Sequence, residues 1–186
     1  MEQAGERRIA APRARVWDAL NDPEILKRCI EGCEDLSKTA DNAFHAVVRA
    51  RVGPVSAAFE GDVTLADLDP PNGYTLEVSA KGGAAGFARG TARVTLADDG
   101  DGTLLAYKAE GRVGGKLAQI GQRLIDAAAR KTADDFFEAL ARELGPTGEP
   151  GVRPKRLPRS SPLLLWAGVA AVVVALGLLA WRLIGG

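Results

Sequence analysis

The feature that most constrains this chain is an uncharged apolar run near its end, LLLWAGVAAVVVALGLLAW, residues 163–181. The run has 19 residues, and a helix that spans a bilayer needs about 20 predominantly apolar residues. Lipid offers the backbone no hydrogen-bond partners, so a helix is the expected conformation. Trp166 and Trp181 lie near its two ends, where indole rings favour the membrane interfaces. We therefore expect a transmembrane tail anchor at residues 163–184.

The charges beside this run predict its orientation. Four basic residues precede it and one follows it: Arg153, Lys155, Arg156, Arg159, and then Arg182. Basic residues collect on the cytoplasmic side of a span. The first 15 residues are polar and charged and contain no apolar segment of a secretion signal. The expected location is the cytoplasmic membrane, with a single C-terminal pass and a soluble domain in the cytoplasm.

The remaining chain divides into a folded part and a linker. Residues 146–162 are rich in Pro and basic side chains, which is typical of a semi-extended linker. Residues 1–145 then form one domain of ordinary size. Residues 1–146 carry 19 basic and 23 acidic side chains. A net negative domain argues against nucleic-acid binding, whereas the basic linker suits anionic lipid headgroups.

The pattern within residues 1–145 predicts the order of its elements. Pro12 is suited to the first position of a helix, and residues 44–52 (FHAVVRARV) alternate as a strand does. Residues 116–144 contain no Pro and place their apolar residues close to one stripe. The predicted order is a strand over 2–10, two short helices before Gly32, six strands between residues 35 and 113, and one long helix over 116–144.

This order predicts an α+β fold. Consecutive strands spaced as antiparallel hairpins form a curved sheet, and the long C-terminal helix packs into its concave side. The arrangement is the helix-grip, or START-like, fold. A curved sheet requires Gly at its bends, and the strand region of this chain is rich in Gly. We expect a cavity between the sheet and the helix.

Six short motifs are distributed along the predicted domain. They are Cys29-Ile30-Glu31-Gly32-Cys33-Glu34, Val52-Gly53-Pro54-Val55, Phe59-Glu60-Gly61, Gly86-Phe87-Ala88-Arg89-Gly90-Thr91, Gly100-Asp101-Gly102-Thr103 and Gly114-Gly115-Lys116-Leu117-Ala118-Gln119-Ile120-Gly121. Together these motifs resemble one family, the CoxG family of carbon monoxide dehydrogenase G subunits. The resemblance covers residues 2 to about 144. Glu31 departs from it, because the family usually has Pro there.

The resemblance implies a START-like domain of the SRPBCC superfamily that has a hydrophobic pocket and is not a catalyst. Members of the family are associated with molybdenum hydroxylases of the CO dehydrogenase type, which they help to bring to the cytoplasmic membrane. The apolar C-terminal run agrees with that role. The resemblance does not identify the partner enzyme of this chain.

The cysteine, histidine and glycine patterns of this sequence do not match a catalytic, metal-binding or phosphate-binding motif. Cys29 and Cys33 have only His45 as a further soft ligand, too few for zinc; in the cytoplasm they should be reduced thiols. The spacing Gly82-x3-Gly86-x3-Gly90 lacks the Lys of a phosphate loop. It fits either a bulged strand edge or a mobile lip over a pocket mouth, with Phe87 as its apolar plug.

The ligand site is therefore predicted to be the hydrophobic pocket. Such sites are lined by apolar and aromatic side chains with a few oriented polar groups. Tyr107 is the expected polar contact, because a buried phenol needs a hydrogen-bond partner. Each candidate also fits plain core packing, since strand parity is not fixed by the sequence. The candidates are Trp17, Leu20, Phe44, Phe59, Tyr74, Phe87, Tyr107, Leu117, Ile120 and Leu124.

A pocket, a membrane anchor and a redox partner together suggest a quinone as the ligand. Quinones have prenyl tails that lie in the bilayer, and a tethered cavity protein could present one, menaquinone or ubiquinone, to the enzyme. We expect no covalent cofactor. Two alternatives remain open: an adaptor that recruits the enzyme without a ligand, and a START-like cyclase or aromatase. The latter requires acid and base groups inside the cavity.

Overall fold

The computed structural model describes residues 2–145. The linker predicted at 146–162, the anchor predicted at 163–184 and its orientation lie outside the described residues. Within residues 2–145, none of the helices is both long enough and apolar enough to cross a membrane.

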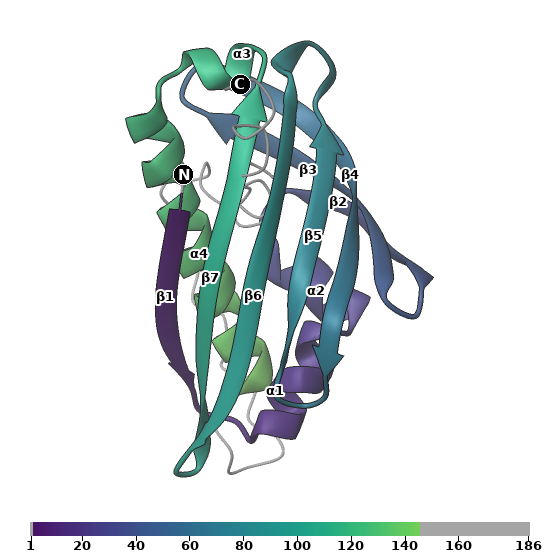
Figure 1. The fold of residues 1–186 in the computed structure, drawn as a ribbon, viewed down its shortest axis with the longest axis vertical. Helices are drawn as coiled ribbons and strands as arrows, with labels where there is room; N and C mark the ends of the chain where they lie inside the picture. Colours follow the sequence, from purple (N-terminus) through teal and green to yellow (C-terminus); the bar gives the residue numbers. More distant parts are fainter. Residues whose placement is uncertain (1, 146–186) are drawn as a thin grey trace, which may run out of the picture.

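The described chain forms seven strands and a small set of helices (Figure 1). The strands are β1 (Glu2–Ile9), β2 (Cys33–Ala40), β3 (Ala43–Val52), β4 (Val55–Asp69), β5 (Gly73–Lys81), β6 (Phe87–Asp99) and β7 (Gly102–Gly114). The helices are α1 (Arg13–Leu20), α2 (Pro23–Cys29), the 3-10 turn η1 (Gly83–Ala85), α3 (Lys116–Gln119) and α4 (Gln122–Leu144).

All seven strands belong to one antiparallel sheet in the order β1-β7-β6-β5-β4-β3-β2. The strands β2 to β7 follow one another as hairpins, and β1 returns to pair with β7. The sheet is curved, and α4 runs along its concave side (Figure 1). The predicted α+β, helix-grip architecture of the domain is confirmed.

The two short helices begin where the local sequence favours a helix start. Pro12 is the N-cap of α1 and not its first residue, one position from the expectation. Asp22 caps α2 by accepting hydrogen bonds from the backbone N–H groups of Glu24 (2.8 Å) and Ile25 (3.3 Å). Pro23 occupies the first turn of α2, where its missing N–H costs nothing.

The prediction of one helix over residues 116–144 is wrong in one respect. The helix is interrupted at Ile120 and Gly121, so that α3 and α4 are separate. Gly121 has a φ of 92°, a value that only glycine adopts without strain. The interruption lets α3 bury Leu117, which is 1% exposed, while α4 follows the sheet in another direction.

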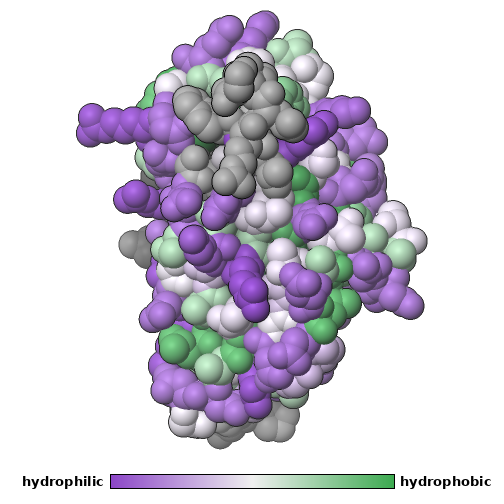
Figure 2. All heavy atoms as spheres, viewed as in Figure 1, coloured by the Kyte–Doolittle hydropathy of each residue, from purple (hydrophilic) through white to green (hydrophobic). Residues whose placement is uncertain are grey.

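The core divides into two main clusters along the sheet. Alternate residues of β3 point inward, beginning with Phe44. One cluster joins α1 and the C-terminal half of α4 to the sheet. The second surrounds Phe59 and Leu117 and joins α3 and η1 to the sheet. The view of Figure 2, in which the strands lie in front of α4, shows a mostly hydrophilic surface with separate apolar patches.

Candidate functional site

A cavity of about 180 Å³ lies between the concave face of the sheet and the helices, and it is partly open to the surface. Most of its wall is aliphatic or aromatic. The lining residues are Gln3, Leu20, Leu26, Ile30, Leu36, Phe44, Ala46, Val63, Leu65, Tyr74, Leu76, Val78, Ala92, Val94, Leu105, Tyr107, Ala109, Ala133, Phe136 and Phe137.

The cavity exists because the middle of the concave side carries small side chains. Ala92 on β6 and Ala109 on β7 are register partners, and both are buried. Ala46 on β3 and Ala133 on α4 also line the space. Larger residues at these positions would bring the sheet and α4 into direct contact, because protein interiors otherwise pack without sizeable voids.

Only three lining residues carry polar side-chain atoms: Gln3, Tyr74 and Tyr107. The Gln3 side-chain amide donates a hydrogen bond to the backbone oxygen of Asp126 (3.1 Å), so it joins β1 to α4. Among the described lining residues there is no carboxylate, histidine, lysine or arginine. The wall can therefore hold an apolar ligand and offer it phenol groups, but it provides no acid–base pair.

Tyr74 is the more deeply buried of the two phenols. It is 5% exposed, and its ring packs edge-on against Trp17 with the centroids 5.6 Å apart. Among residues 2–145, no hydrogen bond involves its hydroxyl group, and the hydroxyl oxygen itself is not fully enclosed. Burial raises the pKa of Tyr74 far above its ordinary value. The side chain therefore stays neutral and keeps a donor available to a ligand.

Tyr107, the polar contact predicted from the sequence, lies nearer the edge of the sheet. Its ring lies 5.3 Å from that of Phe137, and a Cβ atom at Gly5 on β1 would lie 2.7 Å from its hydroxyl oxygen. The phenol oxygen thus extends over the neighbouring strand β1. Partial burial raises the pKa of Tyr107. Neither hydroxyl group has a hydrogen-bond partner among residues 2–145, and Tyr74 is the more deeply buried of the two.

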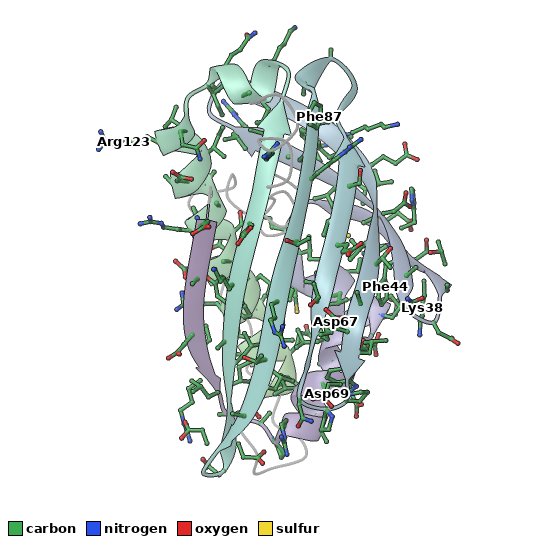
Figure 3. All side chains as sticks on the ribbon, viewed as in Figure 1. Lys38, Phe44, Asp67, Asp69, Phe87 and Arg123 are labelled. Carbon is green, nitrogen blue, oxygen red and sulfur yellow. The ribbon has the colours of Figure 1, made fainter. Side chains whose placement is uncertain are left out.

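The structure brings four of the ten predicted pocket residues together and places the other six elsewhere. Leu20, Phe44, Tyr74 and Tyr107 line the cavity. Trp17 packs behind Tyr74 and does not itself line the space. Phe44 and Phe87 are labelled in Figure 3, where they lie far apart along the sheet.

The remaining predicted residues lie towards the α3 end of the domain. Phe59 and Leu117 are buried in the second cluster, and Ile120 packs against it. Phe87 is half-buried, with the guanidinium of Arg89 5.8 Å from its ring centroid. Leu124 is 52% exposed. Aromatic character alone therefore did not predict which residues line the cavity and which belong to the second core cluster.

Sequence reasoning missed most of the cavity wall. The missed residues are Gln3, Leu26, Ile30, Leu36, Ala46, Val63, Leu65, Leu76, Val78, Ala92, Val94, Leu105, Ala109, Ala133, Phe136 and Phe137. Strand parity carried a usable signal, because Leu76 and Val78 follow Tyr74 at intervals of two and share its face. The alanines carried no such signal, since a small residue lines a cavity only if the residues opposite it in the fold leave space there.

The thiols and the histidine lie outside the cavity wall. Burial raises the pKa of Cys29 to about 11 and also raises that of Cys33. The His45 Nδ1 atom lies 2.9 Å from an Asp62 carboxylate oxygen, and this contact raises the His45 pKa. Within residues 2–145 no group of these side chains is arranged to hold a metal ion.

A curved antiparallel sheet that grips a long helix around an apolar cavity defines a START-like domain. This chain belongs to the CoxG family of carbon monoxide dehydrogenase G subunits, whose model matches residues 5–145. Membership of the family suggests a role linked to CO dehydrogenase. The resemblance drawn from the sequence motifs is thereby confirmed.

Solved structures agree with this assignment. A conserved protein from Geobacillus kaustophilus is 30% identical, with a TM-score of 0.73, over 77% of this chain and 95% of that one. The Mll3558 protein from Rhizobium loti is 22% identical, with a TM-score of 0.59, over 77% and 96%. The TTHA0849 protein from Thermus thermophilus is 18% identical, with a TM-score of 0.60, over 77% and 97%. The last two show the fold alone. Among curated proteins no match was found.

Proposed function

We propose that this protein binds a respiratory quinone in its cavity and connects a CO dehydrogenase-type molybdenum hydroxylase with the cytoplasmic membrane. The observation that carries the proposal is a partly open apolar cavity whose wall includes one buried phenol without a hydrogen-bond partner among the described residues. Apolar sites with a few oriented polar groups are the usual form of a small-molecule site.

The cavity volume suits the ring of a quinone. An apolar cavity of about 150 Å³ is large enough to bind benzene, and this one is about 180 Å³. By this comparison the space fits a single quinone ring, while ring substituents, a second ring and the prenyl tail require the open side of the cavity. The proposal therefore places the ring inside and the tail at the mouth.

Tyr74 provides the orienting contact in this arrangement. A neutral phenol donates a hydrogen bond, and the two carbonyl oxygens of a quinone accept one. The raised pKa of Tyr74 keeps this donor protonated across the physiological range. Because no hydrogen bond among the described residues uses this hydroxyl group, it is free to donate to a ligand carbonyl at this position.

The predicted tail anchor supports the membrane part of the proposal, and family membership supports the part about the enzyme. Oxidation of CO with water gives CO₂, two protons and two electrons, and a quinone takes up two electrons and two protons to become a quinol. The tail anchor predicted at residues 163–184 would keep the cavity beside the bilayer that holds quinones. The linker predicted at residues 146–162 would keep it at high effective concentration near a docked enzyme.

We propose binding, and not catalysis, as the task of the cavity. A START-like cyclase or aromatase needs a general acid and a general base within reach of its substrate. The described wall offers only Gln3, Tyr74 and Tyr107 as polar side chains, and Gln3 already donates to Asp126. This composition favours a carrier over the enzymatic alternative.

The test is native mass spectrometry and lipid extraction of the full chain purified with its host membrane. We expect a bound quinone in the wild type and its loss in Ala109→Leu, which adds volume to the cavity wall. Ala106→Leu is the control, because Ala106 lies on the same strand and lines an outer groove instead. Circular dichroism establishes that both variants are folded, and Ala133→Leu repeats the test from α4.

Two outcomes would contradict the proposal. If the wild-type cavity contains only phospholipid, or no ligand, the proposal that it binds a quinone is wrong. Enzyme recruitment and respiration that persist unchanged in the folded Ala109→Leu variant indicate an adaptor that needs no ligand.

A further inference from the structure

Three loops meet at the end of the domain that contains α3, which we call the α3 tip. They are residues 51–56 between β3 and β4, residues 81–87 around η1, and residues 112–124 from β7 into α4. A Cβ atom at Gly53 would contact the Leu124 side chain, and the backbones of Gly86 and Gly115 pack directly together. The second core cluster contains residues from all three loops.

The α3 tip is basic. Its exposed charged side chains are Arg51, Lys81, Lys116 and Arg123, and none of its three loops contains an acidic residue. Figure 3 shows Arg123 extending away from the molecule near this end. Glu60 is the cross-strand partner of Lys81 in the β4–β5 register, but its carboxylate lies 3.4 Å from the His45 ring nitrogen instead.

Of the fourteen basic side chains elsewhere in residues 2–145, eight have an acidic partner. Those with a carboxylate oxygen within 4 Å are Arg7, Arg8, Arg13, Lys27, Arg28, Arg49, Lys108 and Lys131. Among the described residues, Lys81, Lys116 and Arg123 have none. The charges of these three side chains are thus left for an external partner.

Apolar surface accompanies this charge. Leu124 is 52% exposed and immediately follows Arg123. Pro54 is exposed at the adjoining turn. Basic side chains around a protruding apolar one are the combination that binds an anionic bilayer surface, because the cations meet headgroups while the apolar group enters the interface.

The opposite end of the domain is acidic. Asp67 and Asp69 lie in the β4–β5 hairpin, and Asp98, Asp99 and Asp101 lie in or beside the β6–β7 turn. The Arg13 side chain contacts both regions, through Asn72 (2.6 Å) and Asp98 (3.1 Å). Arg8 pairs with Asp99 and Asp101, both at 2.7 Å, so that five aspartates face two arginines at this end. Figure 3 labels Asp67 and Asp69 in the lower half of the view, away from Arg123. An anionic surface would repel this end and attract the other.

We infer that the α3 tip docks onto anionic lipid headgroups, so that the domain stands on the membrane with its acidic end directed away. The inference rests on the membrane location in the proposed function and adds which surface faces the bilayer. An acidic protein surface is the alternative partner, and the experiment separates the two.

The course of α4 is compatible with this orientation. The helix has 23 residues and is therefore about 34 Å long. Its C-terminal end lies by α1 and α2, where Arg15 donates to the Leu144 carbonyl (3.0 Å) and Arg28 pairs with Glu143 (3.0 Å). The chain thus leaves the domain at the end far from the tip. The predicted 17-residue linker can extend to roughly 56–61 Å, which is enough to return to the bilayer.

The test is hydrogen exchange of the full chain in nanodiscs of phosphatidylcholine alone and in nanodiscs with phosphatidylglycerol added. We expect exchange at residues 51–56 and 112–124 to slow severalfold with phosphatidylglycerol and recover in high salt, with residues 67–73 and 97–102 unchanged. The variant K81Q/K116Q/R123Q should lose this protection. The control K38Q/R93Q/R130Q removes the same charge from exposed residues outside the tip and should keep it.

The following outcomes would contradict the inference that the α3 tip docks onto lipid headgroups. Equal exchange in both lipids, equal loss in the two triple variants, or protection of the acidic end overturns it. Protection that requires added partner enzyme assigns the tip to a protein. If the chain does not enter nanodiscs, the anchoring in the proposed function fails by itself. Co-sedimentation of the same variants with phosphatidylglycerol vesicles then tests the tip, and absence of binding overturns it.

Discussion

At the residue scale, the candidate site depends on which of two tyrosines is the more deeply buried. Tyr74 and Tyr107 both line the cavity. The Tyr107 hydroxyl reaches over Gly5 at the sheet edge, whereas the Tyr74 side chain is buried and its ring packs edge-on against Trp17. The distinction arises from where β1 pairs with β7, a long-range contact that the local sequence around either tyrosine does not reveal.

Replacement of Tyr74 by Phe should weaken quinone binding with little effect on the fold. The loss of one hydrogen bond of about 0.5–1.5 kcal/mol corresponds to a roughly 2- to 10-fold higher Kd. Titration of the full chain in detergent with a short-chain quinone measures the change. Tyr107→Phe is the matched control and should alter the Kd less; a larger effect of that control would assign the contact to Tyr107 instead.

Cys29 should make the stability of the domain fall at high pH. Burial first, and then the nearby Glu143, raises its pKa from 9.0 to about 11. Because the folded-state pKa is above the unfolded one, the thiol stabilises the fold below pH 9, and this contribution is lost as the pH rises towards 11. Urea unfolding at pH 8 and pH 10.5 measures the loss. Cys29→Ala should show a smaller decrease; an identical decrease would refute this origin.

At the element scale, the connections between elements were harder to predict than the elements. Alternation in residues 44–52 gave β3 and its inward face, because period two is a local property. The interruption between α3 and α4 was missed, since the apolar stripe continues through Gly121 and glycine within a helix costs only about 1 kcal/mol. Burial of Leu117 against the sheet favours the interruption, and that contact is not local in the sequence.

The connection between β5 and β6 should tolerate no side chain at Gly86. Gly86 has a φ of 114°, and a Cβ there would overlap the Gly114 carbonyl oxygen. Gly86→Ala should lower the free energy of unfolding by roughly 3 kcal/mol. Gly83→Ala, at a φ of 56° with open space around it, should cost only about 1 kcal/mol. Urea denaturation compares them, and equal costs would argue against this packing.

At the scale of the whole molecule, the sequence predicted the architecture but not the shape of its interior. The order of strands and helices, with the motifs of residues 29–34 and 114–121, led to the family and the fold. The cavity depends on Ala46, Ala92 and Ala109 lining the same side of the sheet. Because the effect of a small residue depends on its partners in space, four of ten predicted lining residues were found by aromatic and helical pattern alone.

The direction of α4 has a further consequence, because the chain leaves the domain at the end opposite the α3 tip. If the tip rests on the bilayer, the predicted linker of 17 residues must be long enough to run from the end of α4 back to the bilayer, so docking requires a minimum linker length. Removing four residues leaves roughly 45 Å of reach, and removing eight leaves roughly 31 Å, less than the length of α4. Tip protection in nanodiscs should survive the first deletion and vanish abruptly with the second; a gradual decline would mean that the domain lies on its side.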